Sequence, residues 1–190
     1  MSSPSSSKAP QAPYDLAGLH RFEWILPRVI ARSSAPFYRC NDADQDIRPQ
    51  TITFLKRQGI KHVISLNAEA HDAVIQRALR KANIHYTPLP IEDFESPDFT
   101  DFNTAFEAFR LHGSAHTLVW CGFGYGRSGT LAVALLMYLE HHKPQPRTFQ
   151  EADYERYHVE TKEQILILNR LQAELRRQRS KLRKKVTSKH

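Results

Sequence analysis

Cysteine is scarce in this 190-residue sequence, which contains only Cys40 and Cys121. Two cysteines cannot build a disulfide framework, so we expect an intracellular protein, cytoplasmic or nuclear. Long apolar runs are also missing. The longest, residues 131–139, is too short to span a bilayer and is typical of a buried helix. The chain does not open with a basic segment followed by an apolar one, so we expect no secretory signal. The ten histidines show no paired ligand spacing, and we expect neither a metal ion nor a cofactor.

Acidic residues are absent from the end of the chain. The formal net charge of the whole sequence is +7, and residues 176–190 contain eight Lys and Arg and no Asp or Glu. The other 175 residues therefore carry a net charge of −1. Such a basic segment is either the solvated end of a helix or a patch that contacts acidic lipid or nucleic acid.

The composition predicts one domain between two tails. Residues 1–13 are rich in Ser, Pro and Ala. We expect them to be disordered, because they lack the apolar surface that would offset the entropy of ordering. Residues 14–175 form the predicted domain, and residues 176–190 are the basic C-terminal tail.

Within the domain, short apolar segments alternate with segments of helical periodicity. This order predicts an α/β fold, with a mainly parallel central sheet of about four to five strands and helices on both faces. Residues 22–31 contain a proline and predict an antiparallel pair at the sheet edge. The other predicted strands are 60–66, 84–89 and 117–120. Two predicted helices have both ends defined, at residues 70–83 and 127–142. The other predicted helices start at Pro49, at Ser96 or Asp98, at Thr148 and after Thr161.

The chemistry is concentrated where the last predicted strand meets the longest apolar helix. The strand leads into Cys121, a glycine-rich loop follows, and the helix begins near Arg127. Glycines allow backbone N–H groups to approach a ligand closely, and a helix N-terminus adds further donors and a positive dipole. The guanidinium of Arg127 can grip a phosphate through two parallel hydrogen bonds. This stretch therefore predicts an anion site around a thiol, with substrate-binding residues Gly122, Phe123, Gly124, Tyr125, Gly126 and Arg127.

The spacing Cys121-x5-Arg127-Ser128 resembles the cysteine-dependent protein tyrosine phosphatases, most closely the small atypical dual-specificity members, over residues 22–175. The resemblance implies a phosphatase catalytic domain. In its mechanism Cys121 attacks phosphorus as a thiolate and forms a thiophosphate enzyme intermediate, which water then hydrolyses. Arg127 and the amides of residues 122–127 would hold the equatorial oxygens. Ser128 is placed to donate a hydrogen bond to the sulfur; alternatively it is an N-terminal helix residue that satisfies a local amide.

A general acid must protonate the leaving oxygen. The resemblance places this acid in residues 89–94, where Asp93 matches the position. Glu92 is the rival, because neighbouring carboxylates on a loop cannot be ranked without geometry. Asp98 and Asp101 instead look like helix-start residues.

The resemblance also extends to residues 159–164, where Glu160 would support the loop arginine and Gln164 would lie near the site. A capping box formed by Thr161 and Gln164 explains part of this segment without catalysis.

Trp120 occupies the position where the family usually has His, an imidazole that helps to hold the loop and to stabilise the thiolate, so we expect slower turnover. Cys40 is expected to be a buried core residue. The alternative is a partner that traps oxidised Cys121 in a disulfide.

The predicted loop contains no cation besides Arg127. This favours a singly phosphorylated ester, such as phosphotyrosine or phosphoserine/threonine on a protein or peptide. Two alternatives stay open. One is a phosphatase acting on a phosphoinositide or an RNA 5′ phosphate, with the basic tail as docking element. The other is a phosphate-binding module with little turnover.

Overall fold

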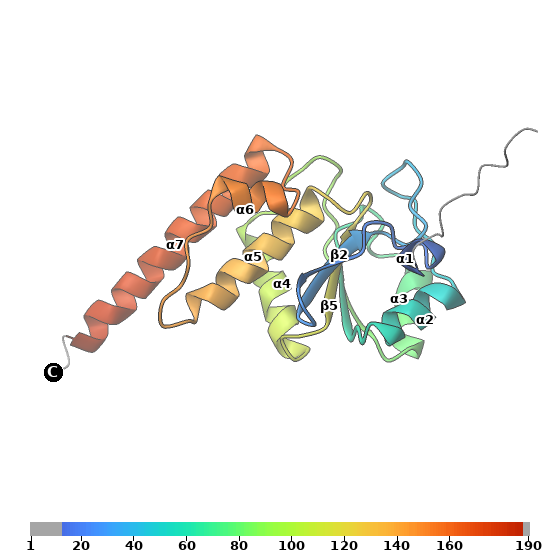
Figure 1. Ribbon diagram of the computed structural model, residues 1–190, viewed down its shortest axis with the longest axis horizontal. Coiled ribbons are helices and arrows are strands. Elements are labelled where there is room, and N and C mark those ends of the chain that lie inside the picture. The colour runs from blue at the N-terminus through green and yellow to red at the C-terminus, as the bar shows by residue number, and fades with distance from the viewer. Residues whose placement is uncertain (1–12, 188–190) are drawn as a thin grey trace, which may run out of the picture.

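The computed structural model describes residues 13–187, which form a five-stranded sheet between two layers of helices (Figure 1). The strands are β1 Glu23–Leu26, β2 Ile30–Ser34, β3 His62–Ser65, β4 His85–Pro88 and β5 Thr117–Cys121. The helices are α1 Pro13–Leu16, α2 Pro49–Arg57, α3 Ala73–Lys81, α4 Phe99–Leu111, α5 Arg127–His141, α6 Glu151–Arg156 and α7 Lys162–Thr187.

The strand order is β1-β2-β5-β3-β4. β1 runs antiparallel to β2 at one edge, and the other neighbouring strands are parallel. The predicted α/β architecture is therefore confirmed, including the antiparallel pair. The predicted disorder of residues 1–13 falls outside the described residues, except for Pro13 at the start of α1.

The two faces of the sheet carry separate cores. One core joins the sheet to α4, α5 and α7, and the other joins it to α2 and α3. Because α5 is buried on every side over residues 127–138, its apolar character extends around the whole helix instead of forming one stripe. This burial fixes the N-terminus of α5 at the carboxyl end of β5, where Cys121 lies.

The starts of α3, α4 and α6 follow capping residues. Asp98, one of the two predicted caps, accepts hydrogen bonds from two amides at the start of α4, and it also forms a capping box with Asp101. α3 begins three residues later than predicted, because Asp72 caps it. α6 begins at Glu151 instead of Thr148, because Gln150 and Asp153 form a capping box there.

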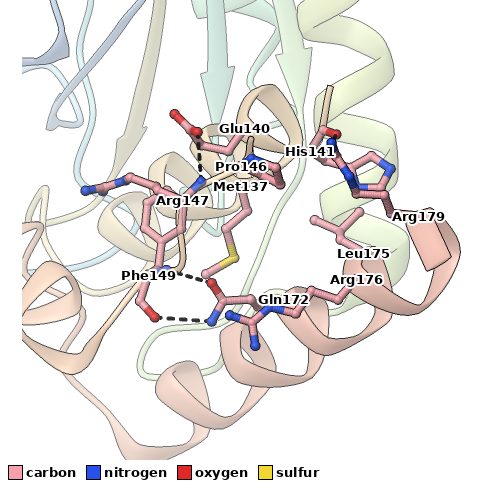
Figure 2. Close-up of a pocket in the computed structure, with 10 residues that line it drawn as sticks. All are labelled: Met137, Glu140, His141, Pro146, Arg147, Phe149, Gln172, Leu175, Arg176 and Arg179. Atoms are coloured by element: carbon pink, nitrogen blue, oxygen red, sulfur yellow. Dashed lines mark hydrogen bonds between the residues drawn. The ribbon is translucent and has the colours of Figure 1, made fainter. Parts of the chain in front are cut away.

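α7 packs along α5 through Leu168, Leu171 and Leu175, and the helix then continues to Thr187 (Figure 1). A pocket of about 50 Å³ lies between these helices and the segment that joins α5 to α6, and Figure 2 shows the residues that line it. Gln172 closes it by exchanging two hydrogen bonds with the backbone of Phe149, of 2.7 and 3.2 Å.

The basic end of the chain is helical as far as Thr187. From residue 176 to residue 184 every side chain is exposed except that of Arg179. The Arg179 guanidinium donates to the carbonyls of His141 and Lys143 at 2.9 and 2.7 Å. Over residues 13–187, no helix is both long enough and apolar enough to cross a membrane.

A buried histidine at the amino end of β3 gives a prediction for acid stability. The ring nitrogens of His62 lie 3.2 Å from Thr117 Oγ1 and 2.8 Å from Thr87 Oγ1, and its ring contacts the stacked pair His112 and His85. Burial, with smaller contributions from His112 and His85, lowers the pKa of His62 from 6.5 to about 3.

The unfolded chain therefore binds a proton that the folded chain does not, and the stability associated with His62 is present above pH 6.5 and lost as the pH falls toward 3. We expect the free energy of unfolding to drop by about 2 kcal/mol from this group between about pH 6.5 and pH 5. Urea unfolding at several pH values measures the drop. His62→Asn should flatten the dependence and exposed His71→Asn should not; equal slopes for all three proteins would contradict the assignment.

Candidate active site

Cys121 is the last residue of β5, and its buried sulfur lies at the centre of the loop that leads into α5. The amide of Gly124 donates to Sγ at 3.3 Å. Sγ also lies 3.2 Å from the carbonyl oxygen of Tyr125 and 3.5 Å from Ser128 Oγ. The strand, loop and helix thus bring the predicted nucleophile and the predicted serine together.

One peptide of the loop differs from the expectation that every amide from 122 to 127 faces the anion. The amide of Gly126 points outward and donates to the carbonyl of His158 at 2.9 Å. The carbonyl of the same peptide, that of Tyr125, consequently faces the sulfur. The Ser128 hydroxyl donates to this carbonyl at 3.1 Å. Ser128 therefore lies near the sulfur, as expected, but its backbone partner is a carbonyl and not the local amide of the alternative interpretation.

Arg127 is buried, with 4% of its side chain exposed, and its guanidinium donates hydrogen bonds to several acceptors. Nη1 donates to the carbonyls of Leu66 and Ile91 at 3.2 and 2.6 Å. Nη2 donates to Asp93 Oδ1 at 2.9 Å, and both terminal nitrogens donate to Asp42. Burial acts to lower the pKa of Arg127, but the Asp42 hydrogen bonds and the charges of Cys121, Asp42 and Asp93 outweigh it and raise the pKa. The arginine is therefore a fixed cation.

Cys121 and Arg127 open into a pocket of about 230 Å³. Asp93 lines it with 48% of its side chain exposed, whereas Glu92, the rival acid, is not among the lining residues. Burial, followed by the charge of Asp93, raises the pKa of Glu160, another lining residue. The remaining lining residues are the aromatic Tyr38, Phe94, Phe123 and Tyr125, together with Gly126, Thr161 and Gln164.

Two further arginines support the loop from outside the pocket. Arg32 of β2 is buried and donates to the carbonyl of Gly124 at 3.0 Å and to Glu23 at 2.8 Å. Arg21 donates to the carbonyl of Phe123 at 2.9 Å and lies 3.5 Å from the centre of its ring. Gly124 has a φ of +98°, and a side chain there would meet the backbone of β2, so glycine is required.

The segment before α7 makes the predicted capping box. The amide of Gln164 donates to Thr161 Oγ1 at 3.2 Å, and Gln164 Oε1 accepts from the amides of Glu160 and Thr161. Gln164 also lines the pocket, so the two interpretations of this residue coexist. The resemblance implied that Glu160 would support Arg127. The positive charge of Arg127 acts on the Glu160 carboxyl, although no hydrogen bond between the two is found among the described residues. Within the described chain, the carboxylates that bond this arginine are Asp42 and Asp93.

Asp42 is a site residue that the sequence did not reveal, because it lies 85 positions before Arg127 in an irregular segment. The expectation of a buried Cys40 is wrong: Cys40 is exposed, because the same segment runs over the surface. Trp120 is fully buried on the other face of the sheet and donates to Ser65 Oγ at 2.7 Å. Its side chain therefore joins β5 to β3.

Comparison with known proteins identifies the fold and the family. The model of the phosphatase domain described as "Swiss Army Knife protein, DSP-PTPase" matches residues 19–181. The solved structure of Tk-PTP in its active form is 23% identical with a TM-score of 0.61, over 80% of this chain and 96% of that one. Kinase-associated phosphatase, with its catalytic-site cysteine replaced by serine, is 21% identical with a TM-score of 0.59, over 77% and 86%.

PTPMT1 in complex with PI(5)P is 16% identical with a TM-score of 0.61, over 80% of this chain and 94% of that one. No curated protein matches the sequence significantly. Structural likeness at these identities shows the protein tyrosine phosphatase-like fold, and the domain model, which covers most of the chain, shows the family. The chain belongs to the DSP-PTPase phosphatase domain family, the small atypical dual-specificity type of the cysteine-dependent phosphatases.

Proposed function

We propose that this protein hydrolyses phosphotyrosine, and also phosphoserine and phosphothreonine, on protein substrates through a thiophosphate enzyme intermediate. The observation that carries the proposal is the lining of the pocket. Among the described residues that line it, Arg127 supplies the cation, and Asp93 and Glu160 add two carboxyl groups. A single guanidinium suits one phosphate group, whereas the carboxyl groups disfavour an ester that carries several. The aromatic side chains at the walls suit a phenyl ring.

The first step is an in-line displacement. The Cys121 thiolate attacks phosphorus, so that an S–P bond forms while the bond from phosphorus to the leaving oxygen breaks, and Asp93 gives its proton to that oxygen. Arg127, the N-terminus of α5 and the loop amides stabilise the charge on the equatorial oxygens. For the amide of Gly126 to contribute, its peptide must turn, which directs the carbonyl of Tyr125 away from the sulfur.

The second step returns the enzyme to its starting state. Water attacks the phosphorus of the intermediate, gives its proton to the carboxylate that acted as acid, and displaces the Cys121 thiolate. Once the carbonyl of Tyr125 has turned away, the hydroxyl of Ser128 is free to donate to the sulfur, 3.5 Å away, and this stabilises the leaving thiolate.

Asp93 and Glu160 can be distinguished as proton donors by the leaving group. A phenoxide needs protonation far more than a p-nitrophenoxide, so loss of the acid should lower turnover of phenyl phosphate by about 100-fold and affect p-nitrophenyl phosphate much less. We expect this pattern for Asp93→Asn and, for Glu160→Gln, a change of less than about threefold.

Steady-state kinetics of the two variants with both esters measures these losses. Glu92→Gln is the matched control, because Glu92 does not line the pocket, and it should show neither loss. The reverse pattern, with the large loss in Glu160→Gln, would make Glu160 the general acid. Its raised pKa favours the protonated form more than in an ordinary glutamate.

A panel of substrates at equal concentration tests the proposed substrate class. We expect phosphotyrosine peptides to be hydrolysed with the highest kcat/KM, ahead of phosphoserine peptides, phosphoinositide vesicles and 5′-phosphorylated RNA. The basic end of α7 supports the competing function, because a polyanion would gain from it. The protein-phosphatase proposal is wrong if a polyanionic substrate has the highest kcat/KM and if that advantage, with its salt dependence, disappears when the basic residues of α7 are replaced by Gln. The residues to replace are Lys181, Arg183, Lys184 and Lys185.

A further inference from the structure

Asp42 contacts Arg127 from a part of the chain remote from the phosphate-binding loop. It lies in the segment between β2 and α2, and its carboxylate faces both terminal nitrogens of the guanidinium. Oδ2 accepts from Nη1 at 2.9 Å, and Oδ1 accepts from Nη2. This two-point geometry fixes the plane of the guanidinium as well as its position.

Asp42 is itself held in place. Its Oδ2 also accepts from the amide of Ala68 at 2.9 Å, and its carbonyl accepts from the side chain of Asn67. These two partners follow directly after β3, so the aspartate is anchored to the carboxyl edge of the sheet. Only 11% of the Asp42 side chain is exposed. A side chain on Gly122 would collide with the Asp42 carboxylate, so loop and aspartate are packed against each other.

The two aspartates that bond Arg127 occupy different places. Asp93 lines the pocket and is half exposed, whereas Asp42 is nearly buried and is not a lining residue. A phosphate that enters the pocket therefore meets Asp93 and can replace it on the guanidinium, while Asp42 keeps its contacts. Release from Arg127 frees Asp93 to reach the leaving oxygen.

From this division we propose that Asp42 is the positioning residue of Arg127: it holds the guanidinium in its phosphate-binding orientation throughout turnover, while Asp93 exchanges with the substrate. The inference rests on the proposed function for its kinetic consequence, but the orientation of Arg127 toward an oxyanion can be tested without turnover.

The test compares Asp42→Asn with Asp44→Asn, a control in the same segment. Asp44 Oδ2 accepts from the amides of Cys40 and Asn41 and does not contact Arg127. Two readouts are used: kcat/KM for p-nitrophenyl phosphate, and the tungstate concentration that protects Cys121 from iodoacetamide. We expect Asp42→Asn to lose about tenfold or more in both, since displacement of a phosphate-gripping group by about 1 Å is costly, and Asp44→Asn to stay within about twofold.

The sign of the tungstate result is informative. Removing a negative charge next to the site should by itself tighten anion binding. Weaker tungstate protection in Asp42→Asn therefore reports lost orientation of Arg127. Wild-type affinity or tighter binding, or an equal loss in Asp44→Asn, would overturn the proposal. If the wild type binds tungstate but hydrolyses no ester, the proposed function fails while this comparison still decides the role of Asp42.

A double-mutant cycle separates positioning from a general structural role. Because Asp42 acts through Arg127, adding Asp42→Asn to Arg127→Ala should cause no further loss of tungstate protection. A full tenfold loss on top of Arg127→Ala would overturn the proposal. Should Asp42→Asn fail to fold, Asp42→Glu replaces it in the test, because it keeps the buried charge pair. Its longer side chain should displace the guanidinium and lower kcat/KM about tenfold. An unchanged kcat/KM would refute the positioning role of Asp42.

Discussion

Replacing Cys121 with serine should lower kcat for p-nitrophenyl phosphate by more than about 1,000-fold. The surroundings of the sulfur, which include the amide of Gly124 and the N-terminus of α5, supply hydrogen-bond donors to an anionic nucleophile at this position. They cannot ionise a serine hydroxyl, which is a far weaker acid. The volume and the hydrogen-bonding contacts of the site change little, so the variant should still bind tungstate.

Cys40→Ser is the matched control for this experiment. Cys40 is exposed and lies outside the pocket lining, so its replacement should leave kcat and KM close to the wild-type values. Stopped assays with phosphate release measure both variants. Substantial turnover by Cys121→Ser would show that another group attacks phosphorus, and a large loss in Cys40→Ser would bring the second cysteine into the mechanism.

Replacing Arg127 with alanine should lower kcat/KM by about 1,000-fold, because the charge on the equatorial oxygens then lacks the guanidinium that faces them in the pocket. Arg127→Lys should lose nearly as much. The partners of Arg127 are two carbonyls and two carboxylates arranged around a planar fork, and an ammonium cannot satisfy them in the same geometry.

The stability of these variants needs a separate measurement. Removal of the guanidinium leaves Asp42 buried without its partner, which typically costs about 3–5 kcal/mol. Thermal unfolding therefore accompanies the kinetics, and Arg57→Lys on α2 serves as an exposed control. A folded Arg127→Lys variant with kcat/KM close to that of the wild type would contradict the role given to the guanidinium fork.

Local sequence was sufficient to predict the strand, loop and helix around Cys121. The apolar segment, the glycines and the arginine follow one another directly, and the predicted elements differ from β5 and α5 by one residue. Apart from α1, the order of the other elements and the mostly parallel sheet were also predicted, because apolar periodicity and crossover rules act over short stretches of chain.

The parts that the sequence did not reveal depend on contacts between distant segments. Asp42 reaches Arg127 only because the segment after β2 folds back over the end of β3. The orientation of the peptide between Tyr125 and Gly126 depends on His158, which no local pattern signals. Cys40 was predicted to be buried from residue type alone, but its polar surroundings keep it at the surface.

The central claim is that Cys121 takes the phosphoryl group from the substrate. Rapid acid quenching of the protein during turnover of p-nitrophenyl phosphate, followed by peptide mass spectrometry, tests it directly. We predict a phosphoryl group on the peptide that contains Cys121, and none on that peptide in Cys121→Ser. Full turnover with the phosphoryl group never found on Cys121, or found on another residue, would contradict the account.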